Sequence, residues 1–359
     1  MNRRVLTGLS GGVDSAVTAL LLKEQGYEVF GCSIDFHGRP DADAAKVAET
    51  LGIPFCTADA RARFSECVIG NFLSEYAAGR TPNPCVQCNP NVKFRTLLVE
   101  ADRLGCDWIA TGHYASVVTL PNGRLSLRMA DAAGRDQTYA LYRLPQEVLR
   151  RLVLPLGAYS KDEVRAIAEA HGLTVAHKHD SQEICFIPDD DHLRFLDERL
   201  PEGSVRPGAF VDDTGRVLGR HEGLPHYTIG QRKGLNLSMG HPVYVTALRP
   251  ETNEVVIGEN ADLFSREVFA KNVSFMGLRG FDGASDAGKP EASCGALRAV
   301  AKIRYAHKAA PCTVEPAGPD GFRVLFDAPQ RAATPGQSVV VYRDGAVLFG
   351  GIIEQEDPS

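Results

Sequence analysis

The sequence contains no apolar run approaching the roughly 20 residues that a helix needs to cross a bilayer. Its first residues lack the apolar segment of a secretory signal. Positive charge is not in excess either, since 39 Lys and Arg stand against 45 Asp and Glu, for a net charge of −6. That balance does not favour a nucleic-acid-binding protein, although a local basic surface would still allow one. We therefore predict a cytoplasmic protein with no membrane partner.

Internal repeats and low-complexity tracts are also missing. The nine cysteines are an odd number in a long chain, which favours reduced thiols over a disulfide framework. A length of 359 residues exceeds one ordinary domain and indicates two or three. The hydrophobic share of 44% and the charged share of 23% are typical of a globular protein with a sizeable core.

The chain is organised around a glycine-rich stretch near its start. Residues 4–7 read as a short buried strand, and apolar residues from 13 to 21 recur at helical spacing. Free backbone N–H groups at such a helix start attract anions. We expect Ser10 and Ser15 to add hydroxyl donors and Asp14 to hold a magnesium ion. The predicted nucleotide-binding residues of this stretch are Gly8, Leu9, Ser10, Gly11, Gly12, Val13, Asp14 and Ser15.

The stretch lacks the lysine of the GxxxxGK[ST] phosphate loop, so it is not built to grip a transferring γ-phosphate. Its SGGVDS pattern instead resembles the pyrophosphatase-loop (PP-loop) ATP enzymes. That resemblance implies ATP and Mg²⁺ as cofactors, with ATP cleaved between the α and β phosphates. An ordinary glycine turn between a strand and a helix is the alternative.

Strand and helix patterns alternate through the first half of the chain. Strands are expected at 27–34, 53–56 and 108–111, and helices at 43–51, 64–76, 92–104 and 162–171. Such alternation predicts an α/β fold with a parallel sheet, whose ligands lie at the carboxyl ends of the strands. Ile34 and Gly112 occupy such ends, so we expect both beside the nucleotide.

Near residue 200 the pattern changes to short strand-like runs separated by glycines. The last hundred residues suggest a β-barrel or sandwich, with a hairpin turning at Asp344 and Gly345. We predict a PP-loop domain at 1–195, a small central domain at 196–261 and a C-terminal β-barrel at 262–359.

Residues 79–90 combine three X-Pro pairs with a CxxC motif, and we predict a rigid exposed loop rather than a helix. Cys85 and Cys88 could form a redox pair, half of a zinc site or part of an iron–sulfur site. No second CxxC or HxxxH follows at zinc-finger spacing. Cys185 is a third candidate, in a loop after the α/β region.

Seven motifs in order resemble the tRNA-specific 2-thiouridylase family and cover nearly the whole chain. They are SGGVDS, GRTPNP with the following CN, TGHYA, DQTYAL, SQEICFIP, GQRKGL and TPGQS. The resemblance implies ATP-dependent thiolation at carbon 2 of the wobble uridine of tRNA. Adenylation makes the uracil oxygen a good leaving group, and a cysteine persulfide supplies the sulfur. The implied partners are tRNA and a sulfur donor, either a cysteine desulfurase or a relay protein.

The resemblance also implies roles for single residues. Cys185 matches the persulfide carrier, Cys88 the nucleophilic cysteine, and residues 83–85 the segment that touches the target base. Each matching residue could instead have a structural role. The positions that match tRNA contacts are Asn83, Pro84, Cys85, His113, Arg135, Asp136, Gln137, Arg304, Tyr305 and Gln337.

The chain departs from the family pattern at Cys85, where many relatives carry an aspartate as a proposed general acid or base. A thiol titrates near 8.5 rather than near 4, so it cannot take that role unchanged. Cys85, Cys88 and Cys185 together could instead ligate a [4Fe–4S] cluster, which is an alternative mechanism. A second departure, residues 35–39, leaves the contacts of that loop open.

Two other functions fit parts of the pattern. An ATP-dependent amidating ligase of the PP-loop superfamily would need an ammonia source and no paired cysteines. A tRNA-binding or metal-binding protein with a vestigial nucleotide site would not produce AMP and pyrophosphate.

Overall fold

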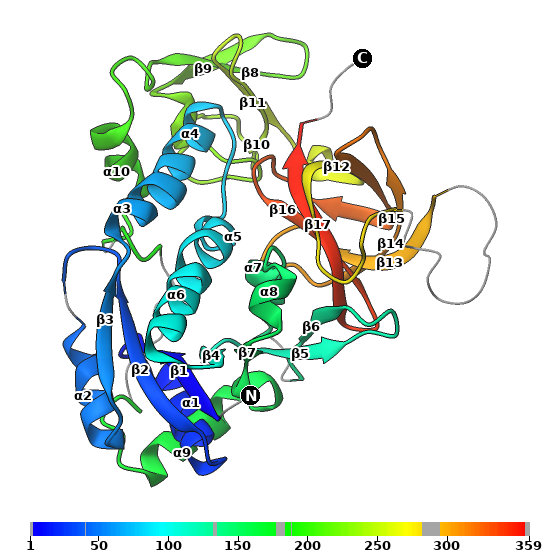
Figure 1. Cartoon of the computed structure of the whole chain (residues 1–359). Coiled ribbons are helices and arrows are strands. Elements are labelled where there is room, and N and C mark those ends of the chain that lie inside the picture. The colour runs from blue at the N-terminus through cyan, green and yellow to red at the C-terminus, as the bar shows by residue number, and fades with distance from the viewer. Residues whose placement is uncertain are drawn as a thin grey trace.

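The computed structural model describes residues 3–39, 41–131, 135–176, 184–187, 189–281 and 295–355. It contains an α/β region, a small central sheet and a C-terminal barrel (Figure 1). This is the predicted fold class, which is confirmed; the predicted domain boundaries stay predictions. No helix in the described residues is long and apolar enough to cross a membrane.

The α/β region is built on a five-stranded parallel sheet in the order β3-β2-β1-β4-β7. Neighbouring residues of β1 point to opposite faces, because side chains alternate along a strand. Val5 packs with α1, α2 and α9 on one face, whereas Leu6 packs with α6 on the other. The strands are β1 (Arg4–Gly8), β2 (Glu28–Asp35), β3 (Phe55–Asp59), β4 (Trp108–Ala110) and β7 (Leu152–Val153).

The helices of this region cover both faces of the sheet (Figure 1). Two of them are extended by π-helical segments, Ser65–Gly70 and Asn89–Lys93. The helices are α1 (Val13–Glu24), α2 (Ala42–Leu51), α3 (Arg61–Phe64), α4 (Asn71–Ala77), α5 (Pro84–Cys88), α6 (Phe94–Leu104), α7 (Thr138–Leu141), α8 (Gln146–Leu149), α9 (Lys161–Ala170) and α10 (His192–Arg199).

The central sheet has four strands in the order β10-β11-β8-β9 around its own apolar cluster. Its strands are β8 (Gly208–Val211), β9 (Val217–His221), β10 (Tyr244–Arg249) and β11 (Glu254–Gly258).

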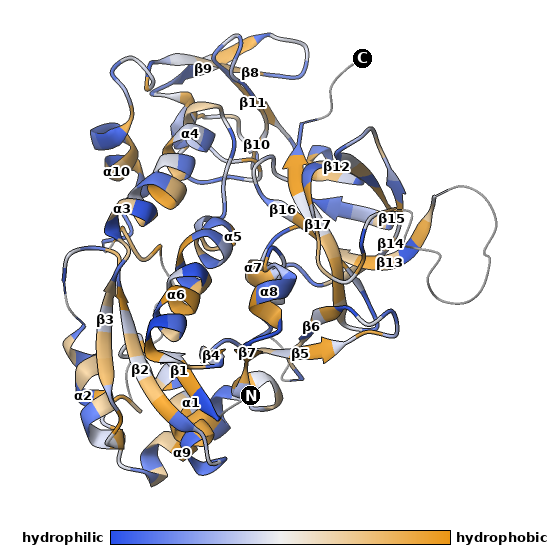
Figure 2. Cartoon of the chain, in the orientation of Figure 1, coloured by the Kyte–Doolittle hydropathy of each residue, from blue (hydrophilic) through white to orange (hydrophobic). Residues whose placement is uncertain are grey.

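Six strands form the C-terminal barrel in the order β12-β15-β14-β13-β16-β17, and pairing of β12 with β17 closes it. Hydrophobic residues concentrate on strands such as β17, as Figure 2 shows. The predicted hairpin is present, with Asp344 and Gly345 both at positive φ. The strands are β12 (Phe264–Phe275), β13 (Leu297–Lys302), β14 (Ala310–Pro316), β15 (Gly321–Arg331), β16 (Ser338–Arg343) and β17 (Ala346–Glu354).

Two strands from the α/β region extend the sheet of the barrel. A hairpin of β5 (Ala115–Thr119) and β6 (Leu125–Met129) leaves the α/β region and pairs with β17. This extension places the loops after β4 close to the barrel. The sequence pattern did not predict it.

Candidate active site

A cavity of about 810 Å³ lies at the carboxyl edge of the parallel sheet. It is bounded by the turn after β1, the end of β2 and the residues after β4, where ligands of such sheets bind. Gly11, Gly12 and Val13 belong to the same turn but are not among its lining residues. The predicted nucleotide residues that line it are Gly8, Leu9, Ser10, Asp14, Ser15, Ile34 and Gly112.

The glycine-rich turn is held in shape by its own serines. The Ser15 hydroxyl donates to the Gly12 carbonyl at 3.0 Å and accepts from the Ser10 backbone N–H at 3.1 Å. In this conformation the Ser15 proton is used inside the turn, and donation by Ser15 to a ligand stays a prediction. No side chain caps the start of α1 at Gly12. The first N–H groups of the helix are thus left for an anion.

Asp14 is fixed by two partners that the sequence pattern did not reveal. The Lys161 ammonium donates to both carboxylate oxygens at 2.8 Å, and the Tyr114 hydroxyl donates to one of them at 2.7 Å. Lys161 is only 6% exposed, so this ion pair offsets part of the cost of burying its ammonium group. Lys161 lies 147 residues from Asp14, and no local motif links the two.

Asp14 still suits a role toward Mg²⁺. The carboxylate is 31% exposed and lines the cavity. Mg²⁺ commonly uses one or two carboxylates together with substrate phosphates and several waters. One remaining lone pair on Asp14 would be enough for such a contact.

Gly112 lies directly against the start of α1. A Cβ atom at this position would come within 2.7 Å of the Asp14 carbonyl carbon and 2.8 Å of the Ser15 nitrogen. Such contacts are too short for any side chain, so only glycine lets the strand end approach the glycine-rich turn. This accounts for a glycine at the position predicted to lie beside the nucleotide.

The segment with the CxxC motif is helical, so the prediction of a rigid loop without a helix is wrong. Asn83 accepts a hydrogen bond from the Cys85 N–H at 3.1 Å and caps α5. Pro84 occupies the first helical position, where a missing N–H costs nothing. The prolines therefore start the helix instead of preventing it. Cys85 is exposed and Cys88 is buried.

The structure brings Cys88 and Cys185 together. Cys185 lines the cavity at the sheet edge, and the next residue, Phe186, packs in the same apolar cluster as Cys88. Burial raises the pKa of Cys88 to about 11. Cys185 reaches solvent, yet surrounding protein still desolvates it, and with the nearby Cys88 and Cys85 thiols this raises its pKa to about 12. Of the SQEICFIP motif, residues 181–183 and 188 lie outside the described residues.

The three thiols do not fit a metal site in this arrangement. Within the described residues, which include Cys85, Cys88 and Cys185, no three His, Cys, Asp or Glu side chains converge closely enough to hold a metal ion. All eight cysteines in these ranges are free. We therefore derive no step through a [4Fe–4S] cluster.

His113 lines the cavity as a neutral group. Its Nδ1 lies 2.8 Å from the Thr111 hydroxyl, and its ring packs near Phe94 at a centroid distance of 5.8 Å. Desolvation, followed by the positive charge of Lys93, holds its pKa well below the usual value. A neutral imidazole can donate or accept a proton but offers no charge to a phosphate.

Other residues predicted to contact tRNA make structural bonds. Asp136 accepts from Thr138 and from the buried Lys302 ammonium, at 2.6 and 3.2 Å. Gln137 accepts from the Tyr114 N–H at 2.9 Å. Arg135 is half-buried beside them.

Three predicted tRNA contacts come from the barrel region. Arg304 donates to the Arg331 carbonyl at 2.8 Å. Tyr305 is 43% exposed and hydrogen-bonds Gln137, which lines the cavity at the sheet edge. Gln337 donates to the Thr81 carbonyl at 2.8 Å and joins the barrel to the segment before α5.

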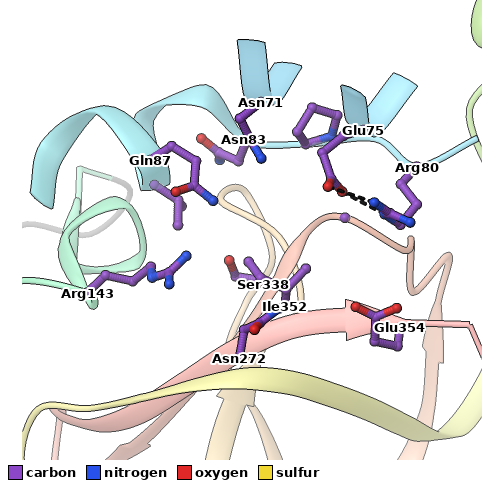
Figure 3. Close-up of a pocket in the computed structure, with 13 residues that line it drawn as sticks. Asn71, Glu75, Arg80, Asn83, Gln87, Arg143, Asn272, Ser338, Ile352 and Glu354 are labelled. Atoms are coloured by element: carbon purple, nitrogen blue, oxygen red, sulfur yellow. Dashed lines mark hydrogen bonds and ion pairs between the residues drawn. The ribbon is translucent and has the colours of Figure 1, made fainter. Parts of the chain in front are cut away.

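A second cavity of about 350 Å³ lies between α4, α5 and the barrel (Figure 3). Asn83, Gln87 and Arg143 project into this space from the α/β region. Its wall is mainly polar, and Glu75 and Arg80 form an ion pair at 2.7 Å on one side. Asn83 thus belongs both to the cap of α5 and to a polar seam between the two regions.

Comparison with known proteins gives matches along nearly the whole chain. Family models match residues 3–189 as a "tRNA methyl transferase HUP domain", 194–259 as a "tRNA methyl transferase PRC-barrel domain" and 286–353 as an "Aminomethyltransferase beta-barrel domain". A protein of Carboxydothermus hydrogenoformans named tRNA-specific 2-thiouridylase MnmA is 48% identical, covering 98% of each chain. One of the same name from Lachnoclostridium phytofermentans is 44% identical and covers 98% of this chain and 99% of its own.

Proposed function

The chain belongs to the tRNA-specific 2-thiouridylase family of sulfurtransferases, and from this premise we propose that it thiolates carbon 2 of the wobble uridine of tRNA in an ATP-dependent reaction. The observation that carries the proposal is that Cys185 lines the cavity while Cys88 lies close enough to affect the pKa of the Cys185 thiol. Two thiols beside an anion-binding turn suit a reaction that couples adenylation to sulfur transfer.

In the first step ATP would bind with its phosphates at the glycine-rich turn. The uracil oxygen attacks the α-phosphorus, and pyrophosphate leaves. Mg²⁺, bound with the help of Asp14, would supply positive charge to the phosphates. The N–H groups at the start of α1 orient the phosphates, and Ile34 and Gly112 border the nucleotide.

In the second step sulfur would replace the activated oxygen. The terminal sulfur of a persulfide on Cys185 attacks carbon 2, and AMP leaves with the oxygen. Carbon 2 is then joined through two sulfurs to Cys185. The Cys88 thiolate attacks the Cys185 sulfur, the S–S bond breaks, and its electron pair stays on the sulfur bound to carbon 2. A Cys88–Cys185 disulfide remains, which an external thiol must reduce before the next cycle.

The target nucleotide would approach beside α5. Asn83, Pro84 and Cys85 begin this helix, and Cys85 and Tyr305 are exposed next to it. The polar seam that contains Asn83 supplies amide groups suited to hydrogen bonds with RNA. Cys85 would act there by contact, because a thiol is a poor substitute for a carboxylate general acid. We propose that the reaction takes place in the cytoplasm and that a cysteine desulfurase or a relay protein supplies the sulfur.

The proposal is tested by incubating the protein with ATP, a persulfide donor and unmodified tRNA. A mercury-gel shift should show thionucleoside, with AMP and pyrophosphate formed in proportion. Formation of AMP without thionucleoside when ammonia is supplied would favour an amidating ligase. If neither product depends on tRNA, the catalytic proposal is wrong and a binding role remains.

A further inference from the structure

Lys93 connects the nucleotide cavity with the two thiols. It ends the π-helical segment Asn89–Lys93, which continues α5 directly after Cys88. Its side chain lines the same cavity as Ser15 and Cys185. Its backbone N–H donates toward the Cys88 sulfur. Lys93 therefore lies near both thiols and lines the same cavity as the glycine-rich turn.

Both thiols lie where negative charge is disfavoured. Desolvation is the main cause that raises the pKa of Cys88 to about 11 and of Cys185 to about 12. The neighbouring thiols raise both further, because like charges repel. In the part of the chain that the structure describes, Lys93 is the cation that acts on both thiols, and its charge lowers each pKa.

The carboxylates of the cavity are already engaged elsewhere. Asp14 is bound by Lys161, Asp35 accepts backbone N–H groups of residues 37–39, and Asp41 caps α2. No ion pair involves Lys93 within the described ranges. Among the residues that the structure describes, no carboxylate neutralises its charge. Among the described residues, the other titratable or charged groups around the cavity and the thiols are Cys32, His37, Arg39, Cys85, His113 and Arg199.

We infer that Lys93 stabilises the negative charge on sulfur during the proposed relay, first on the persulfide of Cys185 and then on the thiolate of Cys88. This inference rests on the proposed function and adds to it the residue that activates the nucleophiles. In the second step a Cys88 thiolate must form before it can attack Cys185. The ammonium offsets the desolvation that opposes this charge, and the proton passes to solvent or buffer.

The test measures thiol reactivity in the full-length reduced protein, without ATP or tRNA. Wild type, Lys93→Met and Lys93→Arg are alkylated with iodoacetamide from pH 6 to 10, and mass spectrometry follows Cys185 and Cys88. Arg95→Met is the matched control, since it removes a cation from the exposed side of α6. The peptide with Cys67 serves as an internal reference.

Lys93→Met should slow alkylation of Cys185 at pH 8 by about tenfold and move its pH profile upward by about one unit. The pH profile for Cys88 alkylation should move in the same direction. Cys88 should be alkylated more slowly than Cys185 at every pH, because it is buried. Lys93→Arg should restore most of the rate, and Arg95→Met should match wild type. Overlap of the Lys93→Met and wild-type profiles would overturn the inference. If Lys93→Met fails to fold, Lys93→Gln provides the same loss of charge with polar packing.

This test is separate from the test of the proposed function. Wild-type protein that thiolates no tRNA would refute the function, while the alkylation profiles would still report the effect of Lys93 on the thiols. Normal thiolation by Lys93→Met, with unchanged profiles, would refute the Lys93 inference alone.

Discussion

At the scale of single residues, the chemistry depends on how thiols are placed. Cys88 is buried in α5 and Cys185 stands at the edge of the nucleotide cavity. Sequence motifs identified both residues by resemblance. Their proximity, and the cation beside them, depend on contacts between segments about 100 residues apart.

Replacing either thiol should block the relay. We expect Cys88→Ser and Cys185→Ser to lower thionucleoside formation by at least about a thousandfold, because a hydroxyl neither carries a persulfide nor attacks a disulfide. ATP affinity should stay within about twofold of wild type. Cys67→Ser is the matched control and should leave the rate unchanged. Thiolation retained by either site variant would contradict the two-thiol relay.

His113 should make stability depend on pH. Its pKa is lowered in the folded state by desolvation and by Lys93, so the folded protein resists protonation. Below about pH 6.5 the unfolded chain binds a proton that the folded chain does not, and the free energy of unfolding falls by at most about 1.4 kcal/mol per pH unit. Above about pH 7.5 this contribution is constant.

Urea unfolding of wild type and His113→Gln between pH 5 and 8 checks this expectation. The variant should show a shallower loss of stability between pH 6.5 and 5. If the free energies of unfolding of wild type and variant fell in parallel with pH, His113 would be protonated equally in the folded and unfolded states.

At the scale of elements, the carboxyl edge of the sheet is shaped by close backbone contacts. Residues after β4 touch the first turn of α1, and Lys161 at the start of α9 holds Asp14. The parallel orientation of β2, β1 and β4 follows from strand and helix alternation, whereas their order in the sheet is seen only in the structure. The angles at which these turns meet do not.

Gly112→Ala should disturb the nucleotide site more than the fold. The new methyl group would press on the backbone of Asp14 and Ser15 at less than 3 Å, so the glycine-rich turn must shift. We expect ATP affinity to fall at least about tenfold, measured by calorimetry, with a loss of about 1–3 kcal/mol in stability. Gly123→Ala is a control for the loss of a glycine, since a Cβ there meets no neighbouring atom, although its positive φ adds some strain. Unchanged ATP binding in Gly112→Ala would show that this contact does not shape the site.

At the scale of the whole molecule, the barrel is held against the α/β region around α5. The Thr81 N–H donates to Pro335, and Gln337 donates back to the Thr81 carbonyl. The buried Tyr139 hydroxyl donates to the Ser338 carbonyl at 2.9 Å. Tyr305 is thereby positioned beside Gln137 and the exposed Cys85. A tRNA bound across this seam would contact both regions.

Gln337 is therefore expected to affect tRNA binding by joining the barrel to the α/β region. Gln337→Ala removes a bond between the two regions and leaves the Thr81 carbonyl with one partner fewer, at a cost of about 1 kcal/mol. We expect tRNA affinity to fall about three- to tenfold in a filter-binding assay while ATP affinity is unchanged. Gln330→Ala is a control on the barrel surface. Equal tRNA affinity in Gln337→Ala and wild type would argue against coupling through this contact.

The sequence by itself determined the parallel α/β region, the glycine-rich turn and the hairpin at Asp344 and Gly345, because each follows from local periodicity or from the backbone freedom of particular residues. It failed locally at α5, where prolines and an asparagine start a helix that had been predicted as a loop. Only the tertiary structure decided that Lys161 binds Asp14, that Lys93 faces two thiols and that β5 and β6 join the barrel sheet. These contacts join residues far apart in the chain, and no local pattern encodes which distant partner a side chain will meet.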